Sequence, residues 1–194
     1  MYLCIDKRLY MDPRLFSVVI ADESHLCYIP DILSAMEEAA RVKGNSIVVR
    51  APEYLACKMR EGKAVIAVKE GVFVGFCYVE TWQGEQYVAN SGLIVCPEFR
   101  GLGVAGRIKR RIFELCRQRY PNARIFSITK SPAVRKMNAA LGFKEVPYGE
   151  LTTDACFWQG CSTCRHYSQL LANGMKDCEC IGMLYLPPSE ANDL

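Results

Sequence analysis

One stretch near the middle of the chain restricts the fold more than any other. From Ser91 to Arg111 the sequence reads SGLIVCPEFRGLGVAGRIKRR: an apolar segment, a proline, a glycine-rich turn and a basic segment. The basic segment has the 3.6-residue period of an amphipathic helix. Its apolar stripe consists of Val104, Ile108, Ile112, Leu115 and Cys116, and its other faces of Lys109, Arg110, Arg117 and Gln118. A buried strand that turns directly into a helix predicts an α/β fold.

The glycine turn between that strand and that helix predicts an anion site. Gly101 and Gly103 carry no side chains, so backbone N–H groups can close around a ligand there. The first N–H groups of a helix are unpaired and its N-terminus is positive, which favours a phosphate. Arg100 and Arg107 can add charge-assisted contacts. A pyrophosphate fits best, with an ordinary strand-to-helix turn as the alternative. The dinucleotide fingerprint and the P-loop sequence do not match.

The rest of the chain predicts a mixed sheet with helices on both faces. Before the central stretch, strands are expected at 16–21, 64–69, 72–80 and 86–96, and helices at about 30–44 and 52–60. After it, strands are expected at 124–129, 143–146 and 181–186, and a helix at about 132–141. Short turns join the three strands between residues 64 and 96, which is typical of an antiparallel meander.

Composition and charge limit the class of protein. The 194 residues suffice for one domain with a buried core, and 51% of them are apolar. The net charge of +3 is too small for a dedicated nucleic-acid binder. No apolar run reaches the length of a membrane span, and the N-terminal residues lack the apolar segment of a signal peptide. We therefore expect a cytoplasmic protein that binds neither membranes nor nucleic acid.

Two motifs in this order resemble those of a known family. The strand, Pro97 and the turn Arg100-Gly101-Leu102-Gly103-Val104-Ala105 resemble the acyl-CoA-binding motif of the GNAT superfamily of N-acyltransferases. Further along, SPAVRKMNAALGFKEV resembles the second family signature, a helix that ends in Leu-Gly-Phe. The resemblance implies one acyl-CoA N-acyltransferase domain over residues 1–194. Its fold would be a GNAT-like mixed, mostly antiparallel sheet with helices on both faces and a splayed central strand.

The resemblance also implies roles for particular residues. Leu93, Ile94 and Val95 would pair by their backbone with the pantetheine arm and the acyl carbonyl of acetyl-CoA or another acyl-CoA. The residues from Arg100 to Ala105 would wrap the pyrophosphate, and Ser131 would lie near the pantetheine. The N–H of Val95 is the expected donor to the oxyanion, and such a donor is typically worth ~10²–10³ in rate.

Two positions depart from the family's pattern and leave the acid and the base open. Asn138 stands where many members have a tyrosine that can protonate the leaving thiolate, and an amide cannot supply that proton. Ala89 stands where many members have a glutamate base. Glu80 and Glu85 are alternative bases, and Tyr148 is an alternative acid. Each of the three also has an ordinary interpretation as a surface or packing residue.

Residues 152–180 are interpreted as a cysteine-rich insertion before the last strand. Four of its cysteines have the spacing of two half-sites for a structural zinc: Cys161, Cys164, Cys178 and Cys180. Cys156 and His166 are spare ligands. The alternatives are a reduced, well-packed insert and a redox pair formed by Cys161 and Cys164. The insertion could stiffen the acceptor side of the cleft or form a homodimer contact.

These observations predict an enzyme that transfers an acyl group, acetyl above all, from acyl-CoA to a primary amine of a small acceptor. The amine would attack directly in a ternary complex. The chain is also similar to bacterial acyltransferases of arginine biosynthesis, which would make a glutamate-type amino acid the acceptor of an acetyl or succinyl group. A third interpretation, motivated by Ala89 and Asn138, is a non-catalytic acyl-CoA-binding sensor or scaffold.

Overall fold

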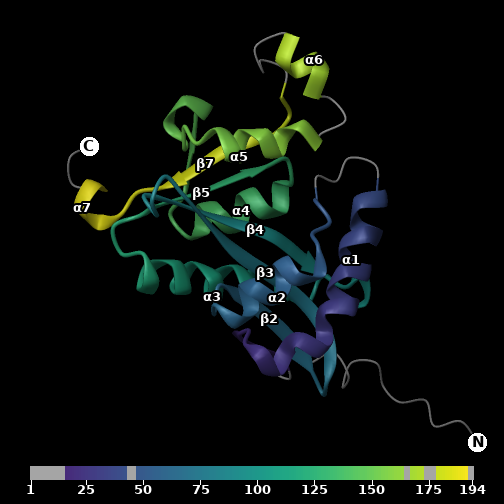
Figure 1. The fold of residues 1–194 in the computed structure, drawn as a ribbon. Coiled ribbons are helices and arrows are strands. Elements are labelled where there is room, and N and C mark those ends of the chain that lie inside the picture. The colour runs from purple at the N-terminus through teal and green to yellow at the C-terminus, as the bar shows by residue number, and fades with distance from the viewer. Residues whose placement is uncertain (1–15, 43–46, 164–166, 173–177, 192–194) are drawn as a thin grey trace, which may run out of the picture.

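A single seven-stranded sheet organises the computed structural model, which describes residues 16–42, 47–163, 167–172 and 178–191. The strands are β1 Ser17–Ile20, β2 Ala64–Lys69, β3 Val72–Trp82, β4 Tyr87–Val95, β5 Arg124–Thr129, β6 Lys144–Val146 and β7 Ile181–Tyr185. Their order in space is β1-β2-β3-β4-β5-β7-β6 (Figure 1). Every neighbouring pair is antiparallel except β4 and β5. The predicted mixed, mostly antiparallel sheet is confirmed.

Helices cover both faces of this sheet, as predicted. Strand β3 alternates between two cores: Val74 and Cys77 face one, whereas Phe73 and Phe76 face the other. Helix α3 Val104–Arg119 packs on the first face, and helices α1 Ile29–Arg41 and α2 Pro52–Arg60 pack on the second (Figure 1). Helix α4 Pro132–Ala140 contacts α3. The order helix, strand, helix, strand after β4 is the predicted one.

Helix α3 shows one clear difference from the sequence prediction. The stripe from Val104 to Cys116 is buried as expected. Lys109, which was placed on another face of the helix, is also buried and only 2% exposed. It lies one turn after Ala105, a residue of the glycine motif, so the two side chains share one side of the helix. The prediction was wrong because it counted apolar residues only.

Short elements complete the fold and were mostly not predicted. They are η3 Glu23–Tyr28, η4 Pro97–Phe99, η5 Tyr148–Glu150, α5 Ala155–Gln159, η6 Gly160–Thr163, α6 Tyr167–Ala172 and α7 Pro188–Ala191. Three of them, α5, η6 and α6, belong to the cysteine-rich segment, and α5 and α6 lie at one end of the molecule (Figure 1).

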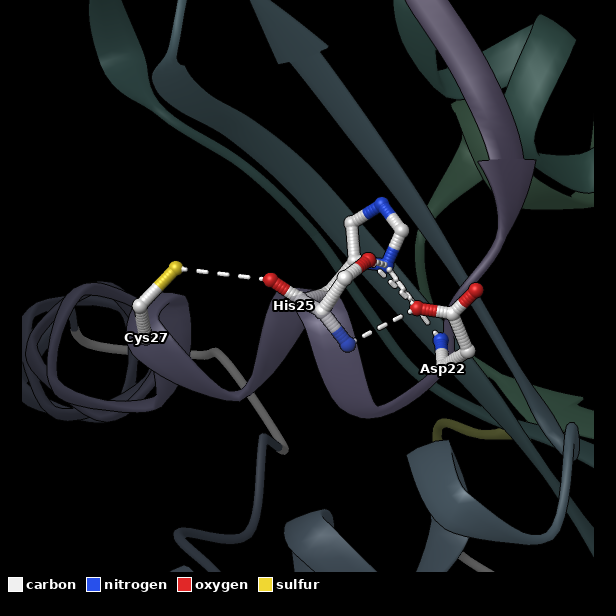
Figure 2. A network of polar contacts seen from close by, with 4 residues as sticks. Asp22, His25 and Cys27 are labelled. Atoms are coloured by element: carbon white, nitrogen blue, oxygen red, sulfur yellow. Dashed lines mark hydrogen bonds and ion pairs between the residues drawn. The ribbon is translucent and has the colours of Figure 1, made fainter.

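The entry to the first helical segment is fixed by a polar network (Figure 2). The Asp22 carboxylate accepts hydrogen bonds from Ser24 N–H at 2.9 Å and from Ser24 Oγ at 2.6 Å. The His25 ring lies 2.9 Å from the same oxygen and accepts from Asp22 N–H at 3.3 Å. This is a reciprocal helix cap. Asp22, Ser24 and His25 are close in sequence and lie on the surface. None of them lines the cleft described below.

Candidate active site

The sheet opens between β4 and β5. The two strands pair in parallel only where Tyr87–Ala89 faces Arg124–Phe126. Beyond this, β4 bends at Gly92, whose φ of 65° is left-handed, and the β3–β4 register shifts at the same point. A Cβ at Gly92 would lie 2.3 Å from the Tyr78 ring, so a larger residue does not fit. The splay predicted for the central strand is confirmed.

The splayed strands enclose a cleft of about 820 Å³. Its walls include residues of β4, β5 and the first turns of α3 and α4. Six residues predicted to hold the cofactor line this cleft: Leu93, Ile94, Val95, Arg100, Ala105 and Ser131. The other four predicted residues do not line it: Gly101, Leu102, Gly103 and Val104. They form the turn between η4 and α3 and the start of that helix.

The glycine turn has the geometry of an anion cradle. Gly101 and Gly103 have φ angles of 78° and 77°, and a Cβ at either would meet no atom within 4 Å. Arg107 N–H donates to the Gly103 carbonyl at 3.2 Å, so the amides of residues 104–106 precede the first hydrogen bond of the helix. Arg100 Nε donates to the Val95 carbonyl at 3.1 Å and ties the turn to β4.

Arg107 does not take the place that the sequence suggested for it. Its guanidinium donates to the Phe16 carbonyl at 2.8 Å, just before β1, and it does not line the cleft. This hydrogen bond joins α3 to the chain just before β1. Arg100 is the arginine of the motif that lines the cleft.

A charged network surrounds Glu80, which is 8% exposed, on the strand next to β4. Its Oε1 accepts hydrogen bonds from Tyr54 Oη at 2.5 Å and from Arg50 Nη2 at 3.3 Å. Its Oε2 accepts one from Ser91 Oγ at 2.6 Å. Arg50 and Ser91 line the cleft, whereas Glu80 does not, so the carboxylate lies one side chain behind the cleft wall.

Burial controls the protonation of the two tyrosines in this network. It raises the pKa of Tyr54, and the hydrogen bond to Glu80 raises that pKa further. Burial, together with the charge of Glu80, raises the pKa of Tyr78 to about 12. Arg50 Nε donates to Tyr78 Oη at 2.9 Å. Both phenols therefore stay protonated at neutral pH.

Comparisons with known proteins agree with this geometry. The family model described as "Acetyltransferase (GNAT) family" matches residues 31–143, more than half of the chain. The chain belongs to the GNAT acetyltransferase family. The match includes the glycine turn, Glu80 and the whole of β4.

Individual relatives of this GNAT chain are more distant. Histidine N-acetyltransferase from Xenopus tropicalis is 32% identical over 71 residues, which are 37% of this chain and 22% of that protein. N-acetylglutamate synthase from Neisseria gonorrhoeae, solved with CoA and N-acetyl-glutamate, matches with a TM-score of 0.60 at 17% identity. That match covers 89% of this chain and 35% of the synthase. A Mycobacterium tuberculosis protein solved with CoA matches with a TM-score of 0.61 at 17% identity, over 88% and 98% of the two chains.

These structural matches show the fold of the GNAT chain and do not identify its acceptor. This chain spans only 22% of the first curated relative and 35% of the synthase. In the residues that the structure describes, no helix is long and apolar enough to cross a membrane.

Of the two positions where this GNAT sequence departs from the family pattern, Ala89 lines the cleft and Asn138 does not. Asn138 is completely buried and does not line the cleft; its Nδ2 donates to Met183 Sδ at 3.6 Å. Ala89 lines the cleft at the last residue pair between β4 and β5. Glu85 is exposed in the β3–β4 turn. Tyr148 Oη donates to the Cys180 carbonyl at 2.6 Å and to Cys178 Sγ at 3.2 Å.

The predicted zinc ligands are only partly described. Cys161, Cys178 and Cys180 are in the structure, and their thiols all raise the pKa of Tyr148 after the larger effect of burial. Cys164 and the spare ligand His166 lie outside the described residues. Among the residues that are described, no three histidine, cysteine or acidic side chains gather as a metal site. The structure therefore gives the zinc prediction no support.

The cysteine-rich segment contributes to the cleft. Phe157 of α5 and Glu179, near the start of β7, line the cleft wall. Glu179 lies 3.6 Å from Lys130 in an ion pair, and Lys130 lines the same wall. The cysteine-rich segment thus forms part of the cleft wall.

Sequence reasoning missed three residues of this site. Arg50 and Tyr54 reach Glu80 across about 30 residues of chain, and no local pattern marks such a contact. Lys109 is the third, and a signal was available for it. It follows Ala105 by one helical turn, so a motif that places Ala105 against a ligand also places Lys109 on that side.

Proposed function

We propose that this chain transfers the acetyl group of acetyl-CoA to the primary amine of a small acceptor, by direct attack in a ternary complex. The observation that carries the proposal is one continuous cleft with a backbone-built anion turn beside it and a Ser91–Glu80 hydrogen bond in its wall. The proposal treats residues 1–194 as one catalytic domain, with residues 152–180 as an insertion.

The cofactor side of the cleft suits acetyl-CoA in shape and charge. Open space lies in front of both glycines of the turn, and the amides of residues 104–106 suit the pyrophosphate. In the described residues no strand pairs with the β5-facing edge of Leu93–Val95. The Val95 carbonyl accepts from Arg100, and the remaining backbone groups of this edge are available to the pantetheine arm. The N–H of Val95 remains the proposed donor to the oxyanion.

The acceptor side supplies a route for the proton that the amine must lose. Ser91 Oγ lies in the cleft wall and donates to Glu80 Oε2 at 2.6 Å. We propose that the amine proton passes to Ser91 Oγ while the Ser91 proton passes to Glu80, so that the carboxylate acts as the base through the hydroxyl. Tyr54 and Arg50 hold the carboxylate in position for this transfer. Glu80 is thereby a base that needs no direct opening to the cleft.

Arg50 favours an amino acid as the acceptor. Its side chain is 34% exposed and lines the cleft, although part of its guanidinium is bound to Tyr78 and Glu80. A guanidinium carries five donors, and its remaining N–H groups can take a carboxylate. An α-amino acid would then present its amine close to Ser91. The names of the histidine N-acetyltransferase and of the N-acetylglutamate synthase are consistent with such an acceptor.

The proposal is tested by measuring CoA release from acetyl-CoA across pairs of acceptors. Each pair is an amino acid and its carboxamide, glutamate and histidine first, with polyamines and peptide N-termini as further acceptors. Amine-dependent CoA release, faster for the acid than for its amide, would support both the enzyme and its acceptor class. Acetyl-CoA binding without turnover on any amine would favour the sensor interpretation, and no binding at all would refute the cofactor site.

A further inference from the structure

Lys109 is a buried cation in the cleft that the proposed reaction has not yet used. It is 2% exposed and lines the cleft together with Ala105 and Met137. In the described part of the chain, no hydrogen bond or ion pair joins its ammonium to an acceptor. Its Nζ lies 6.0 Å from the centre of the Phe143 ring, a weak contact for a full charge. A charge this deeply buried normally has an anionic partner, so the partner is expected from a ligand.

The surroundings of Lys109 place it beside the middle of β4. The titratable groups that act on it from the elements packed around it are the thiols of Cys77 on β3 and Cys116 on α3. Cys116 Sγ donates to Asn90 Oδ1 at 3.2 Å, and Asn90 directly precedes Ser91. Lys109 therefore lies on the α3 side of the sheet beside the middle of β4, where Asn90 faces α3 and the next residue, Ser91, makes its hydrogen bond to Glu80 on the opposite face.

The reaction creates two new anions in turn: the tetrahedral oxyanion, for which Val95 N–H is the proposed donor, and then the sulfur of CoA. We propose that Lys109 donates the proton that the departing CoA sulfur takes up. This inference rests on the proposed acetyl transfer. As the bond from the acceptor nitrogen to the acetyl carbon forms, the amine proton leaves toward Ser91 and Glu80. When the carbon–sulfur bond breaks, its electron pair goes to sulfur, which takes a proton from Lys109 Nζ. Water then returns a proton to Lys109, and Glu80 releases one.

The chemistry of the site suits this role. Burial lowers the pKa of Lys109 below its ordinary value, which makes its ammonium a stronger acid than an exposed lysine. Asn138, in the family's tyrosine position, is buried outside the cleft lining and cannot supply this proton.

The first experiment compares the affinity of the full-length wild-type chain for CoA and for desulfo-CoA at pH 8 by calorimetry. If Lys109 contacts the sulfur, CoA binds more tightly by about tenfold, the effect of one charge-assisted hydrogen bond, and Lys109→Met removes that difference. Equal affinities for the two ligands in the wild type would overturn the proposal whether or not the variant folds. Failure to bind either ligand would overturn the proposed function with it.

The second experiment is the pH dependence of kcat with acetyl-CoA. A general acid must be protonated, so wild-type kcat should fall as the pH rises through the pKa of Lys109. Lys109→Met should lower kcat by about 10²-fold or more, lose this alkaline decline and keep a similar KM for acetyl-CoA. Arg110→Met is the matched control, an exposed neighbour on the same helix, and should leave both unchanged.

Lys109 has one rival role, as a partner for the carboxylate of a dicarboxylic acyl group. In that case Lys109→Met would impair succinyl-CoA far more than acetyl-CoA, and the proton-donor proposal would be wrong. If Lys109→Met impairs amine-dependent turnover equally with acetyl-CoA and succinyl-CoA, the result supports Lys109 as the proton donor.

Discussion

The two halves of the cleft are built in different ways. The cofactor half consists mainly of backbone: a glycine turn, the first amides of α3 and the free edge of β4. The acceptor half consists of side chains from α2, from β3 and β4, and from Arg50 in the connection before α2. A backbone site depends on a few adjacent residues, whereas the side-chain site depends on partners brought together by the whole sheet. Their responses to substitution should differ accordingly.

The largest expected effect tests the backbone half. Gly103→Trp should abolish measurable binding of CoA, because a large side chain would fill the open space of the anion turn. Gly71→Trp is a close control, since Gly71 has a φ of 79°, against 77° at Gly103, and equally open surroundings in the β2–β3 turn. Both variants should lose a similar ~1–2 kcal/mol of stability from backbone strain. Unchanged CoA affinity in Gly103→Trp would show that the turn does not hold the cofactor.

The next effect tests the base of the side-chain half. Glu80→Gln keeps the size of the side chain and removes its basicity, so kcat should fall by about 10²–10³-fold with little change in the KM for acetyl-CoA. Glu85→Gln, in the exposed β3–β4 turn, should stay within about twofold of wild type because it touches no part of the cleft. Steady-state kinetics with the preferred acceptor gives the kcat and KM of both variants for this comparison. A fully active Glu80→Gln variant would remove Glu80 from the mechanism.

A smaller effect concerns the acceptor's carboxylate. Arg50→Met should raise the KM for amino acids by about 10–100-fold, the usual range for a charged hydrogen-bonded contact. The KM for the amino-acid carboxamides should change much less. Dividing the KM of each acid by that of its carboxamide cancels the effect of losing the Arg50 contacts with Tyr78 and Glu80, because that loss affects both acceptors. If acids and amides lose activity in parallel, Arg50 positions Glu80 and does not bind the acceptor.

The smallest effect is expected at the family's tyrosine position. Asn138→Ala should keep kcat within about tenfold of wild type, because an amide supplies no proton. Met183→Leu removes the sulfur that accepts the Asn138 hydrogen bond and should have an equally small effect on kcat. Thermal unfolding of both variants separates lost packing from lost chemistry. A thousandfold loss of kcat in Asn138→Ala alone would mean that this side chain acts on the leaving group in some other way.

The same contrast explains what could be predicted from the sequence. The strands, the main helices and the splay follow from local patterns and two contiguous motifs, and the structure agrees with them. Glu80 could be named as a candidate, but Arg50 and Tyr54 could not, since their contact depends on how α2 and the chain before it fold over β3. The sequence prediction placed Lys109 on the wrong side of its helix, because hydrophobic periodicity considered by itself assigns a lysine to the polar side. The short helices of the cysteine-rich segment lack a sustained hydrophobic period in the sequence.

The short seam between β4 and β5 has a consequence for the stability of the protein. Three residue pairs join β1–β4 to β5, β7 and β6, and the β5-facing edge of Leu93–Val95 is left without a neighbouring strand. The molecule is in this sense a sheet with one strand missing, and a ligand lying in that gap would take the strand's place. Folding and ligand binding are then linked by mass action, so resistance to unfolding should increase with the concentration of whatever occupies the gap.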